Sequence, residues 1–339
     1  MNPLGWGLLL AVLLAGWAVL DGAVQGGVQL VRPVGGRDDA RRRVVLASLA
    51  PILLLGEVWL VAAAGVLLAA FGHVEATLWR AGYPLVVALI AAWAVRDAAL
   101  WLRSRLHAPG WRRAWDVAAQ AASVALPASF GALAGIAWVQ LSAVSPGVTV
   151  GLTDVLAAER GSAGTVVLLT LGLPVLLAAL WAVAARVHGG LVVGRRAPEA
   201  LAAGARRRAR TALVPAAGLA TVGALGALGV ATLGTTSAVV GAVALLAAAA
   251  LALAARFDLD RGQHRQPAVR WAGPALVLAP VVATAAVVGP QVLAMAAPAG
   301  VLHDLTWPVL GAFAAVLVAQ TVSWRVLLRP LGPQTAVFL

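Results

Sequence analysis

Nine stretches of mostly apolar residues, each long enough to cross a membrane as a helix, follow one another along this chain of 339 residues. A spanning helix needs about 20 such residues. Hydrophobic residues make up 62% of the chain and charged residues 11%, whereas soluble domains are about half apolar and a quarter charged. This composition excludes a soluble enzyme, a DNA-binding domain and, because the chain has no Cys, a disulfide-bonded scaffold. The sequence therefore predicts an all-α integral membrane protein with nine transmembrane helices.

Helices are the expected form of these spans because lipid offers no partner to unpaired backbone groups, and the alternating pattern of a membrane barrel is absent. We expect the whole chain, 1–339, to form a single polytopic membrane domain. The spans are expected at about 5–31, 44–71, 82–102, 117–141, 164–185, 211–233, 238–256, 271–296 and 305–328.

The basic residues predict the direction of the chain. All 25 of them are arginines, and the net charge is +12. They gather in alternate loops, while the other set of loops holds only Arg80 and Arg160. Arginine-rich loops stay in the cytoplasm, so nine spans put the N-terminus outside and the C-terminus inside. Because the charge lies between the spans, it indicates membrane topology and not nucleic-acid binding.

Four ionisable residues fall within the first three predicted spans. They are Asp21 in the first, Glu57 in the second, and Arg96 and Asp97 in the third. Such groups are costly in the hydrocarbon, so each is a candidate functional residue. They could form a proton relay, or Arg96 could pair with Asp21 or Asp97 and join two spans. We favour the ion pair, because a carboxylate beside arginine stays ionised.

The histidines bear on whether the chain could hold a haem. By the span map, all five lie in loops or near span ends, and Met295 is the only methionine after Met1; the histidines are His73, His107, His188, His264 and His303. A haem within the bilayer needs axial His, Met or Cys ligands. The sequence therefore predicts no cofactor-binding or metal site in this chain.

Small residues indicate where helices approach closely. Gly22 and Gly26 stand four residues apart in the first span, and Gly131 and Gly135 do so in the fourth. This spacing allows two helix backbones to come into contact. We expect these glycines to serve packing.

Three motifs stand in the first 60 residues: Gly16–Gly22 followed by Gly26, the loop 37–43 with its arginine run, and the segment Ala50–Leu60. In order and spacing they resemble subunit II of the cytochrome bd-type quinol oxidases. The resemblance continues without a gap through Arg96–Arg103 to Trp111 and returns in the last span at Thr306–Trp307 and Gln320. It is dense from about 14 to 115 and thin through the middle.

This resemblance implies a fold, a function and partners. The fold would be two four-helix bundles plus one peripheral helix. The chain would be the haem-free, non-catalytic subunit II of a quinol:O2 oxidase in the respiratory chain of a bacterial plasma membrane. Its partner, subunit I, would carry haem b and haem d and use quinol to reduce O2. Subunit II would shield those haems, with a contribution to proton delivery left open. Lipid, quinone and a small single-span subunit complete the partners that the family suggests.

The chain departs from the family at several acidic positions. Leu54 stands where the family has a buried acid implicated in proton entry, and Val24 and Trp101 replace two further acids. Only Asp21, Glu57 and Arg96 keep the family's polar positions, and the family also accepts Gln in place of Glu57. These departures argue against an inherited proton path through this chain.

Two alternatives belong to other functional classes. One is a secondary transporter or ion-conducting protein with a buried Asp/Glu/Arg site, and the other is a purely structural or assembly protein. Transporters of that kind tend to carry paired broken helices in both halves. Here the buried charges cluster in the first three spans, which favours the oxidase subunit.

Overall fold

The computed structural model describes residues 1–142, 171–231 and 237–327, and these fold almost entirely into helices. Nine of the helices in this part of the chain are long and apolar enough to cross a membrane. Two further helices, α2 and α3, are short. In chain order the helices are α1 (Pro3–Val28), α2 (Val31–Gly35), α3 (Asp39–Ala47), α4 (Ala50–Ala70), α5 (Gly72–Leu102), α6 (Pro109–Ser142), α9 (Leu173–Arg196), α10 (Glu199–Ala231), α11 (Ser237–Asp260), α12 (Pro267–Ala294) and α13 (Ala299–Leu327).

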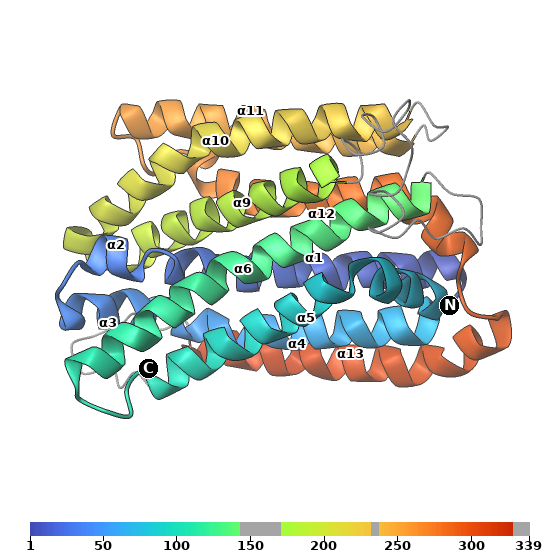
Figure 1. Cartoon of the computed structure of the whole chain (residues 1–339), viewed down its shortest axis with the longest axis horizontal. Coiled ribbons are helices and arrows are strands. Elements are labelled where there is room, and N and C mark those ends of the chain that lie inside the picture. The colour runs from blue at the N-terminus through green and yellow to red at the C-terminus, as the bar shows by residue number, and fades with distance from the viewer. Residues whose placement is uncertain (143–170, 232–236, 328–339) are drawn as a thin grey trace.

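The long helices form two bundles of four and one peripheral helix (Figure 1). The first bundle contains α1, α4, α5 and α6, and the second contains α9, α10, α11 and α12. Helix α13 lies outside both and packs mainly against α4. The two bundles meet chiefly where α9 packs against α1 and α6. The predicted fold class is thus confirmed.

Glycines make the contact between the bundles very close. A Cβ atom added to Gly26 of α1 would lie 1.6 Å from the carbonyl oxygen of Ala185 in α9. One added to Gly131 of α6 would lie 2.3 Å from the carbonyl oxygen of Leu177, also in α9. No side chain fits at either position, so the expected packing role holds for both glycines.

Aromatic side chains fill the core at the same junction. The ring of Phe130 in α6 lies 4.4 Å from that of Trp17 in α1 and 4.8 Å from that of Trp181 in α9, measured between centroids. Both tryptophans are almost completely buried. Tilted and edge-on contacts of this kind add to the stabilisation from apolar burial.

Several helix boundaries differ from the predicted spans. The segment predicted as one span over 44–71 is broken at Ser48 and Leu49 into α3 and α4, and Pro51 stands in the first turn of α4, where proline is tolerated. The third membrane-spanning helix, α5, begins at Gly72, ten residues before the predicted position 82. It is interrupted at Gly82, whose backbone is not helical and which stands two residues before Pro84. The kink follows from the missing amide hydrogen of proline and its clash with the preceding turn.

The fifth span ends later than predicted. It was expected at 164–185, but α9 continues to Arg196, and residues 164–170 lie outside the described part of the chain. Arg186 and His188 ended the predicted span because they are polar, yet both are helical. The helix extends because its last turns, including Gly189 and Val193, are buried against its neighbours.

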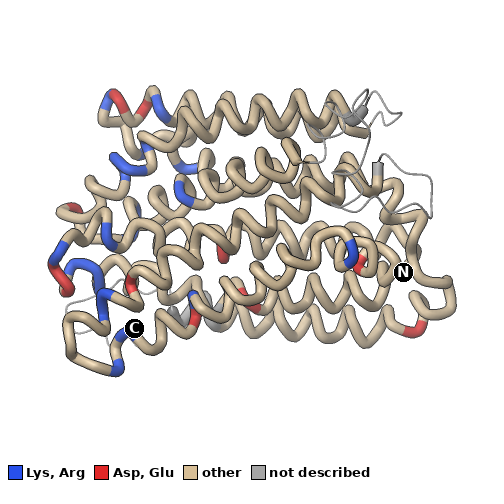
Figure 2. The backbone as a smooth tube through the Cα atoms, viewed as in Figure 1, with Lys and Arg blue, Asp and Glu red and all other residues tan. Residues whose placement is uncertain are grey.

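Charge is distributed unevenly along the bundles. Figure 2 shows most arginines at one end of the molecule, opposite the end where α1 begins. We call this end the Arg-rich end. It contains α2, α3, the α5–α6 loop and the connections α9–α10 and α11–α12.

Candidate functional site

One arginine holds together the ionisable residues predicted within the membrane. Arg96 of α5 donates from Nη1 to Oδ1 of Asp21 in α1 at 2.5 Å, and from Nε to Oδ1 of Asp97 at 2.9 Å. Its Nη2 lies 3.9 Å from Oε1 of Glu57 in α4. We call these four residues the Arg96 cluster. The structure therefore brings all four predicted site residues together from α1, α4 and α5.

Local packing positions the acidic partner of Arg96. Gln25, one turn after Asp21 on α1, donates from Nε2 to Oδ2 of Asp21 at 2.6 Å. A Cβ atom added to Gly56 of α4 would lie 3.0 Å from both Cβ and the backbone nitrogen of Asp21. Helix α4 thus comes close to α1 at this level, and the next residue, Glu57, stands beside the cluster.

The members of the Arg96 cluster differ in exposure. The side chains of Arg96 and Asp21 are 0% and 2% exposed, whereas those of Glu57 and Asp97 are 30% and 24% exposed. Three carboxyl groups surround one guanidinium, so full ionisation would leave two negative charges in excess. That excess lies on the exposed side of the cluster, with Glu57 and Asp97.

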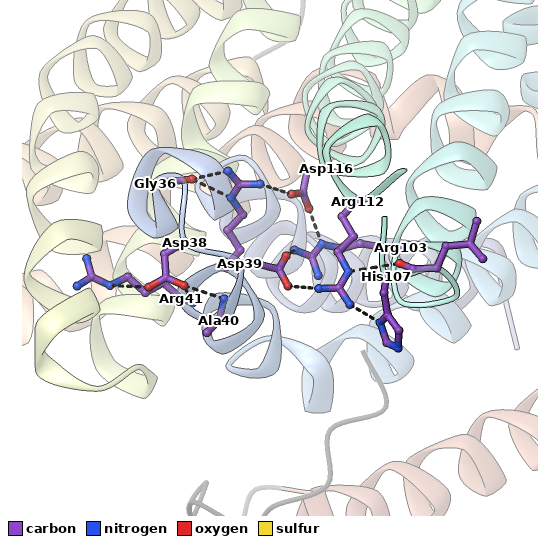
Figure 3. A network of polar contacts seen from close by, with 11 residues as sticks. Gly36, Asp38, Asp39, Ala40, Arg41, Arg103, His107, Arg112 and Asp116 are labelled. Atoms are coloured by element: carbon purple, nitrogen blue, oxygen red, sulfur yellow. Dashed lines mark hydrogen bonds and ion pairs between the residues drawn. The ribbon is translucent and has the colours of Figure 1, made fainter. Parts of the chain in front are cut away.

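A second ionic network, which sequence analysis did not find, lies two helical turns further along α5 (Figure 3). Arg103 donates from Nε to Asp116 at 2.6 Å and from Nη2 to Asp39 at 2.5 Å. Arg42 binds the other oxygen of Asp116 at 2.8 Å, and Arg112 binds the other oxygen of Asp39 at 2.6 Å. These five residues, the Arg103 network, join α3, α5 and α6.

The charges in the Arg103 network change the acidity of its members. Partial burial would raise the pKa of Asp39, but the positive charges of Arg103 and Arg112 outweigh it and hold that pKa below its ordinary value. Burial would likewise lower the pKa of Arg103, yet its bonds to Asp116 and Asp39 raise it. Both shifts favour the charged forms of Asp39 and Arg103.

A signal for this network was present in the sequence. Asp39 stands inside an arginine run, and Asp116 follows Arg112 and Arg113 near the start of α6. Loops rich in arginine are usually explained by membrane topology alone. An acid retained within such a loop is the feature that indicates a specific partner.

The histidines do not form a haem pocket within the described ranges. His73, His107, His264 and His303 are exposed. The expectation that every histidine lies near a span end is wrong for His188, which is 3% exposed within α9. Its Nε2 lies 2.9 Å from the carbonyl oxygen of Val19, and a Cβ atom added to Gly273 would lie 2.6 Å from its Nδ1. This close packing leaves no space for a porphyrin at His188.

A metal site is not apparent either. In the part of the chain that the structure describes, no three His, Asp or Glu side chains are placed to share a metal ion.

The positions where the family's acids are replaced lie in different surroundings. Val24 is buried in α1, and Trp101 near the end of α5 is 45% exposed. Leu54 belongs to α4, but its side chain is outside the described part of the structure.

Comparison with known proteins identifies the relatives of this chain. The family described as cytochrome bd terminal oxidase subunit II matches residues 2–327. Cytochrome bd-I ubiquinol oxidase subunit 2 of Escherichia coli (strain K12) is 37% identical over 111 residues, which are 33% of this chain and 29% of that protein. Cytochrome bd ubiquinol oxidase subunit 2 of Bacillus subtilis (strain 168) is 33% identical over 112 residues, 33% of this chain and 32% of that protein. These matches thus span about a third of each relative's length.

A solved structure shares the fold. The structure of bd oxidase from Geobacillus thermodenitrificans superposes with a TM-score of 0.60, covering 96% of this chain and 98% of that chain at 10% identity. The arrangement of helices is therefore shared over almost the whole chain. With the match over residues 2–327, the chain belongs to the cytochrome bd terminal oxidase subunit II family of multi-pass membrane proteins.

Proposed function

We propose that this chain is the haem-free, non-catalytic subunit II of a quinol:O2 oxidase and pairs with a haem-bearing subunit I in a bacterial plasma membrane. Its relatives are described as ubiquinol oxidase subunits, and the whole chain acts as one membrane domain in this proposal. Quinol oxidation and O2 reduction take place in the partner, which holds haem b and haem d. This chain completes the membrane core and shields those haems. The transporter alternative rests on the Arg96 cluster alone, whereas the family match over residues 2–327 supports an oxidase subunit.

The observation that carries this proposal is the exposure of Glu57 and Asp97 on the least covered side of the molecule. Helices α4, α5 and α13 are the most exposed of the nine. In the most apolar stretch of α13, 11% of the residues are buried. Apolar side chains such as Val61, Ile90 and Val318 point outward from them. Carboxyl groups facing lipid are costly, so this side, which we call the α4–α5–α13 face, is the one that meets a protein partner.

The Arg96 cluster then has a structural role. The buried pair of Arg96 and Asp21 joins α5 to α1, and Gln25 satisfies the remaining carboxylate oxygen. A hydrocarbon side chain at position 54 can neither carry a proton nor hold a water molecule. We propose that Asp21, Arg96, Asp97 and Glu57 stabilise the first bundle and its junction with subunit I, more than they conduct protons.

The class of the complex is tested by purification. The chain is purified with an affinity tag in mild detergent, and a reduced-minus-oxidised spectrum is recorded. We expect haem b and haem d bands to co-purify with the tagged chain in the presence of the partner gene and to disappear without it. Haem bound to the chain expressed alone would refute the haem-free assignment.

The proposed face is tested by cross-linking. The chain has no Cys, so a single introduced cysteine gives an unambiguous signal. Val61→Cys in α4 and Ile90→Cys in α5 should cross-link to subunit I with a short bifunctional reagent. Val243→Cys in α11 is the matched control, since its side chain is 59% exposed on the second bundle. Cross-linking from the control position alone would overturn the proposed face.

A further inference from the structure

Arginines without acidic partners gather in the second bundle at the Arg-rich end. Between residues 186 and 270 the sequence holds 11 arginines and three carboxylates. Two of these three carboxylates already form ion pairs, because Glu199 binds Arg206 and Asp260 binds Arg210 and Arg256. Positive charge in this stretch therefore exceeds the negative charge that the same stretch carries.

Two of these arginines stand where the apolar stretches of their helices end. On α9 the uncharged residues 173–185 lead up to Arg186, and on α10 the uncharged residues 211–231 begin three residues after Arg208. The two helices are antiparallel, since a Cβ atom added to Gly190 would lie 3.0 Å from Cβ of Ala209 and one added to Gly194 would lie 2.6 Å from Cγ of Arg206. Arg186 and Arg208 are therefore offset by about five residues, or about 7 Å, along the two helix axes. The positive charge of Arg208 acts on the guanidinium group of Arg186.

These two guanidinium groups are left with donors to spare. Both side chains are half-buried. Arg186 makes no hydrogen bond or ion pair with the described residues, and Arg208 donates only to the carbonyl oxygen of Pro33, at 3.4 Å. Each guanidinium carries five donors in a fork that suits phosphate oxygens. Two like charges held together without a carboxylate are stabilised by an anion between them.

The surroundings of the pair are apolar on the side away from the Arg-rich end. On α9, Val175, Ala179 and Ala182 share a stripe with Arg186, and Val175 is 68% exposed. On α10, Pro215 and Val222 follow Arg208 at intervals of seven residues, and both are exposed. Basic groups ending an apolar stripe match a phospholipid, with its phosphate at the arginines and its acyl chains along the helices.

We propose that Arg186 and Arg208 form a binding site for the phosphate of an anionic phospholipid. The pair lies on the second bundle, and neither residue belongs to the α4–α5–α13 face proposed for subunit I. The phosphate of a phospholipid lies at the membrane surface, where the apolar stretches of both helices end. The bound lipid would hold α9 and α10 together where their own charges repel.

The test compares lipids on the purified whole complex in a non-ionic detergent. Thermal unfolding is followed while phosphatidylglycerol, phosphatidylcholine with the same acyl chains, or inorganic phosphate is added. We expect phosphatidylglycerol to raise the unfolding temperature at concentrations where the other two do not. In the double variant Arg186→Gln/Arg208→Gln, half of the shift should need about twentyfold more lipid, since each basic residue contributes about fivefold to anionic-lipid affinity.

The control variant carries the same change in charge. Arg37→Gln/Arg265→Gln removes two exposed arginines in loops and should respond to phosphatidylglycerol as the wild type does. Equal responses of the wild type to both lipids, or equal responses of the two double variants, would overturn the proposal.

Two further outcomes would also overturn it. An effect reproduced by inorganic phosphate would indicate a free-anion site. Loss of subunit I from the double variant with an unchanged lipid response would assign the arginines to an acidic protein segment. If the double variant does not assemble, the single variant Arg208→Gln is measured instead, with an expected fivefold change. Failure of this test leaves the haem spectrum of the complex, and thus the proposed function, unaffected.

Discussion

At the scale of single residues, Arg96 and Asp21 form the most deeply buried ion pair in the described part of the chain. Arg96→Ala would leave Asp21, which is 2% exposed, without its cation. Removing one partner of a buried ion pair typically costs about 3–5 kcal/mol. We expect Arg96→Ala and Asp21→Asn to lower the yield and thermal stability of the assembled complex, measured by haem content per membrane protein. Arg105→Ala, at an exposed position, should assemble normally. Normal yields of Arg96→Ala would contradict the structural role.

A substitution of Glu57 distinguishes a structural role of the Arg96 cluster from a role in proton transfer. Its carboxyl group lies 3.9 Å from Arg96 and is 30% exposed, so its interaction with the arginine is weaker than that of Asp21. Glu57→Gln keeps the shape of the side chain, and we expect turnover per assembled complex to stay within about twofold of wild type, equivalent to less than 1 kcal/mol. Oxidase activity is measured per haem d. Loss of turnover with normal haem content would make Glu57 a proton carrier.

The ionisation of Asp39 makes the stability of the fold depend on pH. A carboxyl group whose pKa is lower in the folded than in the unfolded protein stabilises the fold above its unfolded pKa of about 3.9 and loses this effect as the pH falls through the folded value. Asp39 has such a lowered pKa. The unfolding temperature of Asp39→Asn should therefore lie below that of wild type at pH 7, and the difference should shrink as the pH falls below about 4. Asp304→Asn, at an exposed site, is the control. A difference that is constant with pH would refute the role of this charge.

Sequence analysis found the residues of the Arg96 cluster but not those of the Arg103 network, for a physical reason. An ionisable group within a span is conspicuous because the hydrocarbon makes it costly. Asp39 and Asp116 lie near helix ends, where charged residues are common and carry no such signal. Only the fold brings these two acids to Arg103, across 64 and 13 residues of sequence.

At the scale of helices, hydropathy predicted how many spans there are better than where they end. Composition cannot show that α9 continues through Arg186 and His188. Whether a helix can hold polar residues at these positions depends on the neighbouring helices α1, α10 and α12. The break at Ser48 has a similar cause. Apolar residues such as Val45 and Leu46 in α3 resemble part of a span, but they belong to a separate buried cluster with residues of α1 and α2.

The glycine contacts make a prediction about helix packing. Gly26→Ala would force a methyl group to within 1.6 Å of the Ala185 carbonyl oxygen, so α1 and α9 would have to separate. Overpacking of this kind costs about 1–3 kcal/mol or more. We expect reduced thermal stability and less assembled complex, measured by size-exclusion chromatography. Gly218→Ala in α10 is the matched control, because nothing lies within 4 Å of its added methyl group. It should be neutral or slightly stabilising, since alanine favours helix. Equal effects of the two variants would contradict the close contact.

At the scale of the whole molecule, the direction of the peripheral helix α13 is the one expected for the ninth of nine spans that alternate in direction. The amino group of Met1 donates to Oγ1 of Thr306 at 2.6 Å, so α1 and α13 begin at the same end. Gln320 near the other end of α13 donates to the carbonyl oxygen of Leu55 in the first turns of α4. Helix α13 therefore runs from the arginine-poor end to the Arg-rich end.

This direction predicts where the two termini lie in the cell. Because arginine-rich loops stay in the cytoplasm, we expect the Arg-rich end to lie there, and α1 begins at the opposite end of the molecule (Figure 2). We expect a reporter fused after Leu339 to be active only when it is one that functions in the cytoplasm. A reporter placed before Met1 should be active only when it is one that functions outside. Both fusions are measured with the partner subunit present, and haem content confirms assembly. A C-terminal reporter active only outside would invert the proposed topology and move the Arg186–Arg208 lipid site to the outer leaflet.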